Sequence, residues 1–321
     1  MKKEETVSKE TKDHLSSGAE IIVSVSGGKD STACCLKLFE MGYSKKDFRR
    51  VFMDTGWESQ TTYKYLDYLE QHIGKIERIR KNISISKMSE EIQEFILREE
   101  KLLGHQSDFL RAIMERHIFP GHFRKYCTTV LKIEPFAEHI QNQDNDIIVV
   151  LGLRRAESQR RSQIEEWEWN ERYNNYVWRP LYLWSEEDVI NIHSRFNLLP
   201  NKLYLQGANR VGCFPCIYSR KSEIKMLSQD RLDLIDRIER FLGELNYKNK
   251  FGKDSKLDNL LALRHKLSGY HFQPMFNGEI GKDHINNIYE WSKTHRGGKQ
   301  FSLFDFEEPT CVKWGLCDFA K

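Results

Sequence analysis

Short apolar runs alternate with longer segments of helical spacing along most of the chain up to residue 212. Five of the runs are rich in β-branched or aromatic residues and have the length of buried strands. They cover residues 20–26, 49–55, 75–81, 146–152 and 176–181. Because strands that alternate with helices form parallel sheets covered on both faces, the pattern predicts a doubly wound parallel sheet of the α/β class.

Small and polar residues follow three of the predicted strands directly. These residues are Ser24, Ser26, Gly27 and Gly28 at the first strand, Asp54, Thr55 and Gly56 at the second, and Gly152, Leu153 and Arg154 at the fourth. Ligands of such folds bind outside the carboxyl ends of the strands. We therefore expect the three segments to line one crevice.

The pattern changes near residue 212. Beyond it the sequence predicts long charged helices, over residues 222–245 and 256–266, and no clear further strand. We predict three parts, which are a flexible N-terminal segment over residues 1–18, an α/β domain over 19–211 and a helical, cysteine-bearing region over 212–321.

The composition adds little to this picture. At 321 residues with 39% hydrophobic content, the chain is long enough to bury a substantial core. Its net charge of +3 neither requires nor excludes a nucleic-acid partner. The first residues lack the apolar core of a signal peptide, and no run of about 18 apolar residues occurs. We expect a cytoplasmic protein without a membrane partner.

The segment "VSVSGGKDS", residues 23–31, ends the first predicted strand in two adjacent glycines. It lacks the glycine spacing of a Walker-type phosphate loop. Instead Lys29, Asp30 and Ser31 follow at once, at the start of a predicted helix. Backbone N–H groups, hydroxyls and an ammonium group at a helix N-terminus favour an anion. The segment is therefore a predicted anion site, with a plain glycine turn as the alternative.

This segment resembles the Ser-Gly-Gly-x-Asp-Ser loop of the PP-loop ATP pyrophosphatases. In that family the loop grips the pyrophosphate that is released while AMP is transferred to a substrate oxygen. The resemblance implies ATP and Mg²⁺ as cofactors and a PP-loop nucleotide-binding domain over residues 19–211. It also implies Lys29, Asp30 and Ser31 as catalytic residues.

Six further strings, in chain order, resemble the phosphoadenosine phosphosulfate (PAPS) reductase-like branch of that family. They are "MDTGWE", "FPGHFRKYCTTVLKIEP", "VVLGLRRAESQRR", "RPLYLWSEEDV", "LPNKLYLQG" and "RVGCFPC". In the first string, Asp54 is a candidate ligand for Mg²⁺ or a ribose hydroxyl, with a helix cap as the alternative. Glu58 is expected to brace the same loop.

Four guanidinium groups crowd one loop in the third string. They belong to Arg154, Arg155, Arg160 and Arg161. Such close cations repel one another unless anions lie between them. We expect this loop to hold a polyphosphate or a nucleic-acid backbone, with a solvated cationic face as the alternative. In the family arrangement, Lys132 is the expected phosphate contact nearby, and Arg124 and Lys125 add charge.

The seven cysteines, in a reducing compartment, suit core residues, redox groups or metal ligands. Cys34 and Cys35 lie on the apolar face of a predicted helix, where we expect them to pack in the core. Cys213 and Cys216 form a Cys-x-x-Cys turn, which is half of a metal site and needs further ligands.

The resemblance supplies candidates for those ligands. In iron–sulfur adenylylsulfate reductases a corresponding Cys-x-x-Cys is joined by an adjacent cysteine pair, of which one member, Cys127, is present here. Cys311 or Cys317 is the candidate fourth ligand. We expect a 4Fe–4S cluster on Cys127, Cys213, Cys216 and one C-terminal cysteine. Zinc on Cys213, Cys216, Cys311 and Cys317 is one alternative, and a redox or persulfide role is another.

The C-terminal sequence bears on the choice of reaction. Assimilatory sulfonucleotide reductases carry a Glu-Cys-Gly-Leu-His motif, whereas this chain reads Trp-Gly-Leu-Cys-Asp over residues 314–318. The overall resemblance is therefore nearest to the ATP pyrophosphatase component of DNA phosphorothioation systems. It implies adenylation of a non-bridging phosphate oxygen of DNA, a cysteine desulfurase as the sulfur donor, and other proteins of a modification system as partners.

Two other functions stay open. A sulfonucleotide reductase would act on PAPS or adenosine phosphosulfate and release sulfite. A non-catalytic nucleotide-sensing module of a defence or regulatory complex would bind ATP without turnover, although the intact Lys29, Asp30, Ser31 and Asp54 speak against it.

Two segments outside these motifs are candidates for contacts. Residues 165–178 mix tryptophan and tyrosine with acids, which favours partner docking or plain hairpin packing. Residues 291–304 carry four basic residues around two glycines, which favours a loop that tracks a nucleic-acid backbone, or a flexible connector.

Overall fold

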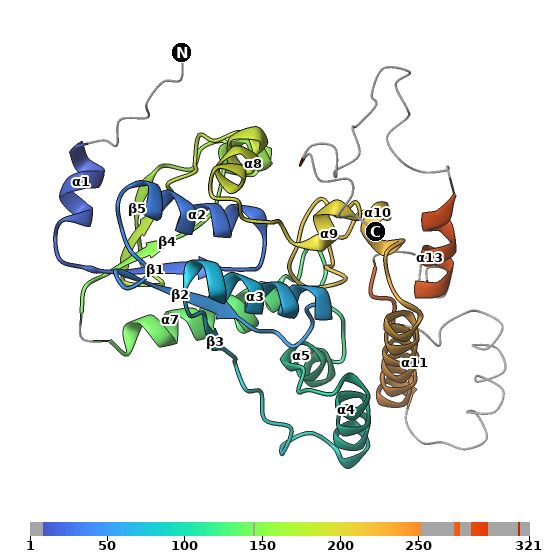
Figure 1. Ribbon diagram of the computed structural model, residues 1–321. Coiled ribbons are helices and arrows are strands. Elements are labelled where there is room, and N and C mark those ends of the chain that lie inside the picture. Colours follow the sequence, from blue (N-terminus) through green and yellow to red (C-terminus); the bar gives the residue numbers. More distant parts are fainter. Residues whose placement is uncertain (1–8, 144, 252–272, 277–283, 295–313, 315–321) are drawn as a thin grey trace.

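The computed structural model describes residues 9–143, 145–251, 273–276 and 284–294, and residue 314. Figure 1 shows a twisted sheet covered by helices and, beside it, a separate group of helices that contains much of the C-terminal region. Clusters of buried apolar residues lie on both faces of the sheet and inside the helical group. The predicted helix over residues 256–266 lies outside the described residues.

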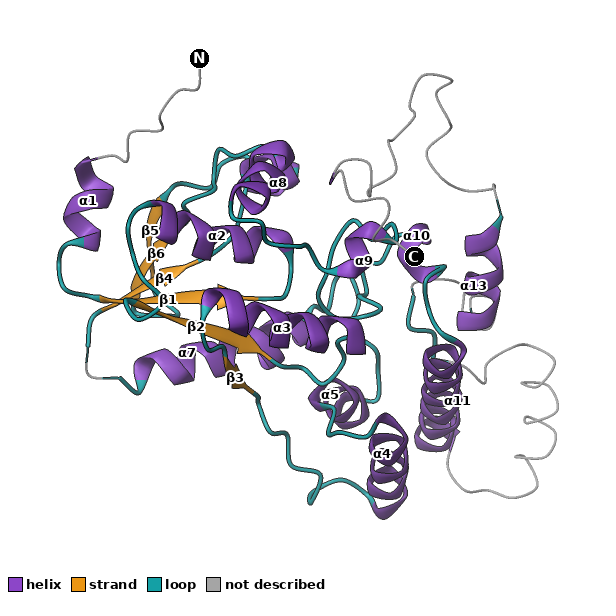
Figure 2. Ribbon diagram, viewed as in Figure 1, coloured by secondary structure: helices purple, strands orange, loops and turns teal. Residues whose placement is uncertain are grey.

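Within the described residues the sheet has six strands in the order β3-β2-β1-β4-β6-β5. They are β1 Glu20–Val25, β2 Phe48–Met53, β3 Glu77–Ile79, β4 Ile147–Val150, β5 Trp167–Asn170 and β6 Asn175–Trp178. All neighbours pair in parallel except β5, which runs antiparallel to β6 at the edge (Figure 2). The predicted α/β class is confirmed, although the sheet is mixed rather than fully parallel.

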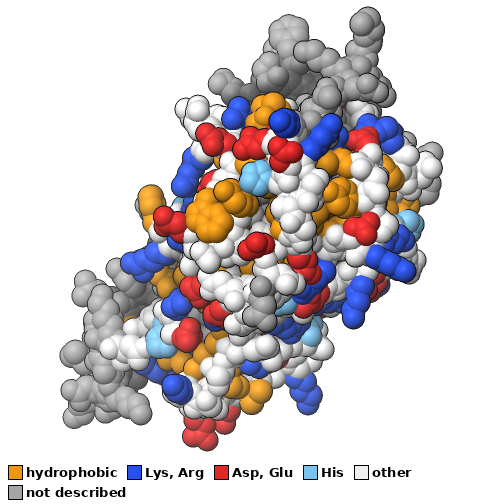
Figure 3. All heavy atoms as spheres, turned by 90° about the vertical axis from the view of Figure 1, so that its left-hand side faces the viewer, with side chains coloured by type: hydrophobic (Ala, Val, Ile, Leu, Met, Phe, Trp, Pro, Cys, Tyr) orange, Lys and Arg blue, Asp and Glu red, His pale blue; other side chains and the backbone are white. Residues whose placement is uncertain are grey.

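The strands β5 and β6 form a hairpin within residues 165–178, the segment for which partner docking and hairpin packing were both considered. Trp167 and Trp178 stack across it with ring centroids 5.7 Å apart, and both are buried. The hairpin interpretation is therefore confirmed. Trp169 and Tyr176 keep exposed faces on the same hairpin. Figure 3, which shows this side of the molecule, has acidic and basic side chains interspersed around the apolar ones, so this face lacks a continuous cationic surface.

Helices cover both faces of the sheet because the central strands are apolar on both sides. Ile21, Val23 and Val25 of β1 pack under α2 Lys29–Glu40, α3 Gln60–Ile73 and α8 Glu186–Arg195. The alternate residue Ile22 joins a cluster on the other face under α7 Glu134–Gln141. The parallel pairing of β1 with β2 and with β4 places the carboxyl ends of the three strands side by side.

A second group of helices packs on its own apolar core. It contains α4 Glu90–Leu103, α5 Asp108–Arg116, α11 Gln229–Phe251 and α13 Ile285–Lys293. A fully buried carboxylate, Glu99 of α4, accepts hydrogen bonds from Arg237 of α11 at 2.8 to 3.1 Å and ties the two helices together. No helix among the described residues has both the length and the apolar character needed to cross a membrane.

The helix predicted over residues 222–245 is wrong at its start. The structure has a short helix, α10 Lys221–Ile224, before α11 begins at Gln229. The interruption follows from Glu223, whose buried carboxylate accepts from the backbone N–H groups of Asn209, Arg210 and Arg220. These contacts hold α10 against the preceding loop and turn it away from α11.

The N-terminal segment contains a helix, α1 Lys9–Leu15, that the sequence did not predict. The buried Thr11 donates a hydrogen bond to Glu166, and Trp167 donates to Thr11, both at 2.9 Å. Residues 9–15 are therefore packed against the edge hairpin, in contrast to the flexible segment expected over 1–18. Residues 1–8 lie outside the described part, and the boundary at residues 211/212 stays a prediction.

We expect the stability of the sheet layer to fall at acidic pH because of His193 on α8. The ring is buried, its Nδ1 donates to the Val189 carbonyl at 2.8 Å, and burial lowers its pKa to about 4. Below about pH 6.5 the His193 ring binds a proton in the unfolded chain but stays neutral in the folded protein. The free energy of unfolding therefore decreases as the pH falls, by about 2 kcal/mol at pH 5. Denaturant unfolding at pH 5 and pH 7 measures this loss.

The variant His193→Leu should flatten this part of the pH profile. His72 supplies the matched control, because it is exposed and its Nδ1 lies 2.9 Å from the carbonyl oxygen four residues earlier on α3. The variant His72→Leu should keep the wild-type pH dependence. Equal flattening by both substitutions, or by neither, would contradict this assignment.

Candidate functional site: the carboxyl edge of the sheet

The glycine loop between β1 and α2 is closed by the first turn of the helix. Ser31 Oγ accepts from the Ser26 N–H at 3.0 Å, and the hydroxyls of Ser31 and Thr32 donate to the Gly28 carbonyl at 3.2 and 3.0 Å. Gly27 has φ +71°, and a Cβ there would stand 3.0 Å from a methyl carbon of Thr62. The loop therefore needs glycine for both its conformation and its packing.

Gly152, after β4, approaches this helix start from the neighbouring strand. A Cβ at this position would lie 2.7 Å from the carbonyl carbon of Asp30 and 2.8 Å from the Ser31 nitrogen. Both contacts are to backbone, which has no side-chain torsion to turn out of the way. The predicted meeting of the first and fourth strand ends is confirmed by this approach.

We expect Gly152→Ala to lower stability by about 1–3 kcal/mol, as overpacking against fixed atoms does. It should also weaken nucleotide binding, because the added methyl group displaces the first turn of α2. Thermal unfolding and ATP titration measure the two effects. Gly212→Ala is the control, since a Cβ at Gly212 meets nothing within 4 Å. Equal stability of the two variants would contradict the close approach.

A buried group of charges lies at the N-terminus of α2. The Lys29 ammonium group is 3.7 Å from Asp30 Oδ2, 3.4 Å from Glu186 Oε1 and 4.9 Å above the Tyr204 ring. Asp30 also pairs with Arg154, which reaches it from the loop after β4. Lys29 and Arg154 are both buried. Two cations thus converge on one helix start, where an anion is favoured.

Sequence reasoning missed Glu186 and Tyr204, although both lie in strings that it matched. Ser185 and Asp188 form a capping box, with hydrogen bonds of 2.8 and 3.1 Å, which places Glu186 in the first turn of α8. Tyr204, in α9 Lys202–Leu205, accepts from the Lys29 backbone N–H at 3.1 Å. The capping box Ser-x-x-Asp was a readable signal for the start of α8.

The four arginines of the loop after β4 do not act as one group. Arg154 faces Asp30, whereas Arg155 donates to the Ile164 carbonyl at 2.7 Å and lies over the Tyr182 ring. The loop turns through two short 3₁₀ helices, Arg155–Glu157 and Gln159–Arg161, and leaves Arg160 exposed. The expectation that Arg155 contributes to the cationic cluster is therefore not supported by its position.

Arg161 is the second arginine of the loop that lies at the site. It pairs with Glu157, and its pKa is lowered by burial and then by the positive charges of Arg210 and Arg154. Sequence reasoning missed Arg210, which is exposed at the start of the Cys-x-x-Cys string. Because neighbouring cations disfavour each other, an anion between Arg154, Arg161 and Arg210 would relieve the repulsion.

The loop after β2 is stabilised from within the protein. Asp54 accepts from Tyr63 and Gly56 through Oδ1 and from Arg80 through Oδ2, at 2.5 to 2.9 Å. Both of its oxygens thus accept hydrogen bonds within the protein, and Asp54 does not cap the following helix α3, whose N-cap is Ser59. The role of Asp54 as a Mg²⁺ ligand stays a prediction. Glu58 is buried and accepts from the Thr55 hydroxyl at 2.9 Å, so it braces the loop as expected.

The Cys-x-x-Cys segment docks on this same loop. The Phe214 N–H donates to the Trp57 carbonyl at 3.0 Å, and the Trp57 indole donates to the Pro215 carbonyl at 3.1 Å. Cys213 then lies 3.6 Å from a Glu58 oxygen and 3.7 Å from the Thr55 hydroxyl. Contacts from distant sequence therefore bring one thiol to the carboxyl end of β2.

Lys132, in the π-helical turn Thr129–Ile133 before α7, lies beside this thiol. Burial raises the pKa of Cys213 to about 12, while the nearby Lys132 ammonium group opposes the rise. The pKa of Lys132 is itself raised, because the charge of an ionised Cys213 and then that of Glu58 act on it. Lys132 is therefore a protonated partner for a thiolate or another anion at this place.

Cys127 and Cys216 lie at the same place. Cys127 is half-buried in the short helix α6 Tyr126–Thr128, and burial followed by the charge of Cys216 raises its pKa. Among the described residues, however, no three His, Cys, Asp or Glu side chains approach closely enough to hold a metal ion. Cys311 and Cys317 lie outside the described residues. Cys34 and Cys35 are fully buried in the core under α2, as expected.

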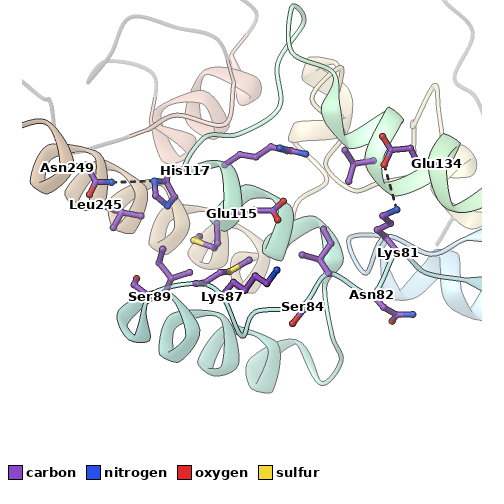
Figure 4. Close-up of a pocket in the computed structure, with 16 residues that line it drawn as sticks. Lys81, Asn82, Ser84, Lys87, Ser89, Glu115, His117, Glu134, Leu245 and Asn249 are labelled. Atoms are coloured by element: carbon purple, nitrogen blue, oxygen red, sulfur yellow. Dashed lines mark hydrogen bonds and ion pairs between the residues drawn. The ribbon is translucent and has the colours of Figure 1, made fainter.

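Two cavities lie near these groups. A small one of about 100 Å³ is lined by Ser24 and Ser26 of the first strand end, by Glu58, and by Lys132 and Gly212. A larger one of about 750 Å³ lies between α4, α5 and α11, away from the glycine loop (Figure 4). Its lining includes Lys81, which pairs with Glu134, and His117, which contacts Asn249.

Most of the chain that forms the sheet and its loops is similar to known proteins. Residues 20–219 match the phosphoadenosine phosphosulfate reductase domain. The chain is 29% identical to a 37.8 kDa protein from the gpa 5' region of Escherichia phage 186, over 92% of this chain and 96% of that protein. It is 25% identical to adenosine 5'-phosphosulfate reductase of Staphylococcus haemolyticus, over 62% of this chain and 71% of that enzyme.

A solved structure is also similar. The phosphate complex of phosphoadenylyl-sulfate (PAPS) reductase from Candida auris superimposes with a TM-score of 0.45 at 16% identity, and covers 66% of this chain and 98% of that chain.

Proposed function

The chain belongs to the phosphoadenosine phosphosulfate reductase domain family, and we propose that it is an ATP pyrophosphatase that activates an acceptor oxygen for replacement by sulfur. The observation that carries this proposal is the buried Lys29 ammonium group at the N-terminus of α2, within the sequence Ser-Gly-Gly-Lys-Asp-Ser. A helix N-terminus and an ammonium group together stabilise the negative charge that develops on departing pyrophosphate.

The remaining phosphate oxygens of ATP have three cations within reach of the same loop. Arg154 is held in place by Asp30, and the positive charges of Arg161, which pairs with Glu157, and of Arg210 lie near it. Mg²⁺ would neutralise charge between phosphate oxygens when bound. Asp30 is the carboxylate at the loop that would hold the ion, through Oδ2, because its Oδ1 pairs with Arg154 and both oxygens of Asp54 accept hydrogen bonds.

The chemistry balances as two displacements. An acceptor oxygen attacks the α-phosphorus of ATP, the bond to the β-phosphate breaks, and pyrophosphate leaves. A sulfur nucleophile then attacks the acceptor atom, and AMP leaves with the former acceptor oxygen. If the nucleophile is a protein persulfide, a second thiol must cleave the remaining sulfur–sulfur bond. We assign to Lys132, which lines the small cavity, the role of stabilising charge on the acceptor.

We further propose that Cys127, Cys213 and Cys216 hold a 4Fe–4S cluster together with Cys311 or Cys317. The half-burial of the three cysteines near the ammonium group of Lys132 supports this proposal, although their side chains do not lie close enough together in this structure to enclose a metal ion. A bound cluster would supply sulfide or electrons at this edge of the sheet. The protein's own part is to lower the energy of the thiolates through Lys132 and to exclude water by burial.

The acceptor and the partners follow from the resemblance found in the sequence. We propose DNA as the acceptor, through a non-bridging phosphate oxygen, and a cysteine desulfurase as the sulfur donor within a modification system. The cationic groups Arg161, Arg210 and Lys132 at the site support a phosphate-bearing acceptor. Similarity to an adenosine 5'-phosphosulfate reductase supports a second candidate, a sulfonucleotide reductase.

One pair of assays separates the candidates. In the first, the protein receives ATP, DNA and a persulfide-loaded desulfurase, and AMP and pyrophosphate are measured. In the second, it receives adenosine phosphosulfate or PAPS with a dithiol reductant, and sulfite is measured. The proposal expects AMP and pyrophosphate in the first assay and no sulfite in the second. Sulfite formation would establish the reductase, and ATP binding without products in either assay would establish a sensing module.

A further inference from the structure

A tight turn presents one aromatic ring entirely to solvent. Gly121 and Arg124 exchange two backbone hydrogen bonds, of 3.2 and 3.1 Å, so His122 and Phe123 stand at the tip of the turn. The side chain of Phe123 is 98% exposed, far more than any other large apolar side chain among the described residues. An exposed ring on a loop closed by its own backbone has no folding role, because it buries no surface within the chain.

The turn is fixed in position beside the cysteines. The His122 ring meets the Tyr218 ring edge to face, with centroids 4.6 Å apart, and the Lys125 ammonium group lies 5.2 Å from the centroid of the same ring. Tyr218 follows Cys216 by two residues, and Lys125 precedes Cys127 by two. Phe123 is therefore displayed at a set place next to the region where sulfur transfer is proposed.

The charge around the turn indicates its partner. From Arg116 to Ile133 the chain carries four lysines or arginines and no acidic residue. Arg124 and Arg116 are exposed, and Lys125 is half-exposed. Cations that flank a single exposed aromatic ring match a nucleic-acid strand, whose bases stack on rings and whose phosphates pair with cations. An apolar protein partner would leave these cations without opposite charge.

We propose that Phe123 stacks on a base of the nucleic-acid acceptor while Arg124 and Lys125 contact its flanking phosphates. This proposal rests on the function proposed above, and adds the residue that sets which phosphate of a strand lies at the reaction site. Because a base in a closed duplex presents no free face for stacking, the turn binds a single-stranded or locally opened strand.

Binding of a fluorescently labelled single-stranded DNA oligonucleotide, followed by anisotropy at fixed salt, tests the proposal. We expect Phe123→Ala to weaken binding about tenfold or more. Phe123→Trp should retain binding because it keeps a stacking ring. Phe123→Leu should bind as weakly as Phe123→Ala, because it keeps apolar area without a ring. The control Phe196→Ala removes a 38% exposed ring elsewhere and should bind like wild type.

The outcomes distinguish this proposal from the proposed function. If the wild type binds DNA and Phe123→Ala binds equally well, the stacking role is wrong while a DNA acceptor stands. If Phe123→Leu binds like wild type, the ring contacts an apolar partner and the stacking role is again wrong. If the wild type binds no nucleic acid under any salt condition, the acceptor class and the stacking role fail together. Thermal unfolding of each variant confirms that the fold is retained.

Discussion

The variant Lys29→Ala is expected to release pyrophosphate from ATP about 100-fold more slowly, or worse, than the wild type. The ammonium group is the one buried lysine charge at the start of α2, and the leaving pyrophosphate needs such a charge. The fold should survive, because Asp30 keeps its pair with Arg154 and Glu186 is half-exposed to water. Pyrophosphate formation under saturating ATP measures the effect.

Lys37→Ala is the matched control for this variant. Lys37 lies on the same helix two turns further on and pairs with Glu40 at 3.0 Å, away from the glycine loop. Its loss should leave pyrophosphate release within about twofold, because sites that share no partner contribute independently. An unchanged rate in Lys29→Ala would show that the loop holds something other than pyrophosphate.

The variant Cys127→Ser is expected to lose iron and visible colour when the protein is prepared without oxygen. Cys127 lies on a helix that is distant in sequence from the Cys-x-x-Cys turn, yet it packs against the same apolar cluster as Cys213 and Cys216. A serine oxygen is a poor substitute for a thiolate on iron. Iron, sulfide and zinc contents together with the visible spectrum measure the change.

Two comparisons sharpen this test. Cys34→Ser, in the core under α2, should keep its iron and lose about 1 kcal/mol of stability, because a small buried apolar group becomes polar. Cys311→Ser and Cys317→Ser, made separately, show which of them completes the site. A wild-type protein that contains zinc and no iron, and whose zinc is unaffected by Cys127→Ser, would support the zinc alternative instead.

Much of the fold could be predicted because buried parallel strands leave a strong local signal. The apolar runs near β1, β2 and β4 mark strands that are buried on both faces, and the small residues after them mark the functional edge. The antiparallel strand β5 was absent from the predicted strands, and a hairpin here was only one of two interpretations, because β5 reads Trp-Glu-Trp-Asn and lacks that apolar run.

The residues of the candidate site could be predicted only where a single short segment carries them together. The glycine loop carries its own lysine, aspartate and serine, and its sequence alone indicated an anion. Glu186, Tyr204 and Arg210 join it from distant segments, through a capping box, a four-residue helix and a loop held by Glu223. Such partners depend on tertiary packing, which local pattern does not encode.

In the loop after β4, the sequence likewise predicted the charged residues but not their partners. Four neighbouring arginines suggested one cationic cluster, but a 3₁₀ helix turns Arg155 onto Tyr182 and leaves Arg154 and Arg161 at the site. Likewise, Asp54 was a candidate metal ligand in the sequence, whereas in the fold Arg80, which follows β3, pairs with it. The sequence thus identified the charged side chains of both loops, whereas their ion-pair and ring partners depend on the path of the backbone.

Transfer of labelled oxygen tests the central claim most directly. DNA whose non-bridging phosphate oxygens carry ¹⁸O is incubated with the protein, ATP and the sulfur donor, and the AMP is examined by mass spectrometry. If the acceptor oxygen is adenylated and then replaced by sulfur, each AMP formed with a sulfur-containing product carries one ¹⁸O atom. AMP that takes its oxygen from water, together with DNA that keeps its ¹⁸O and gains no sulfur, would contradict the account.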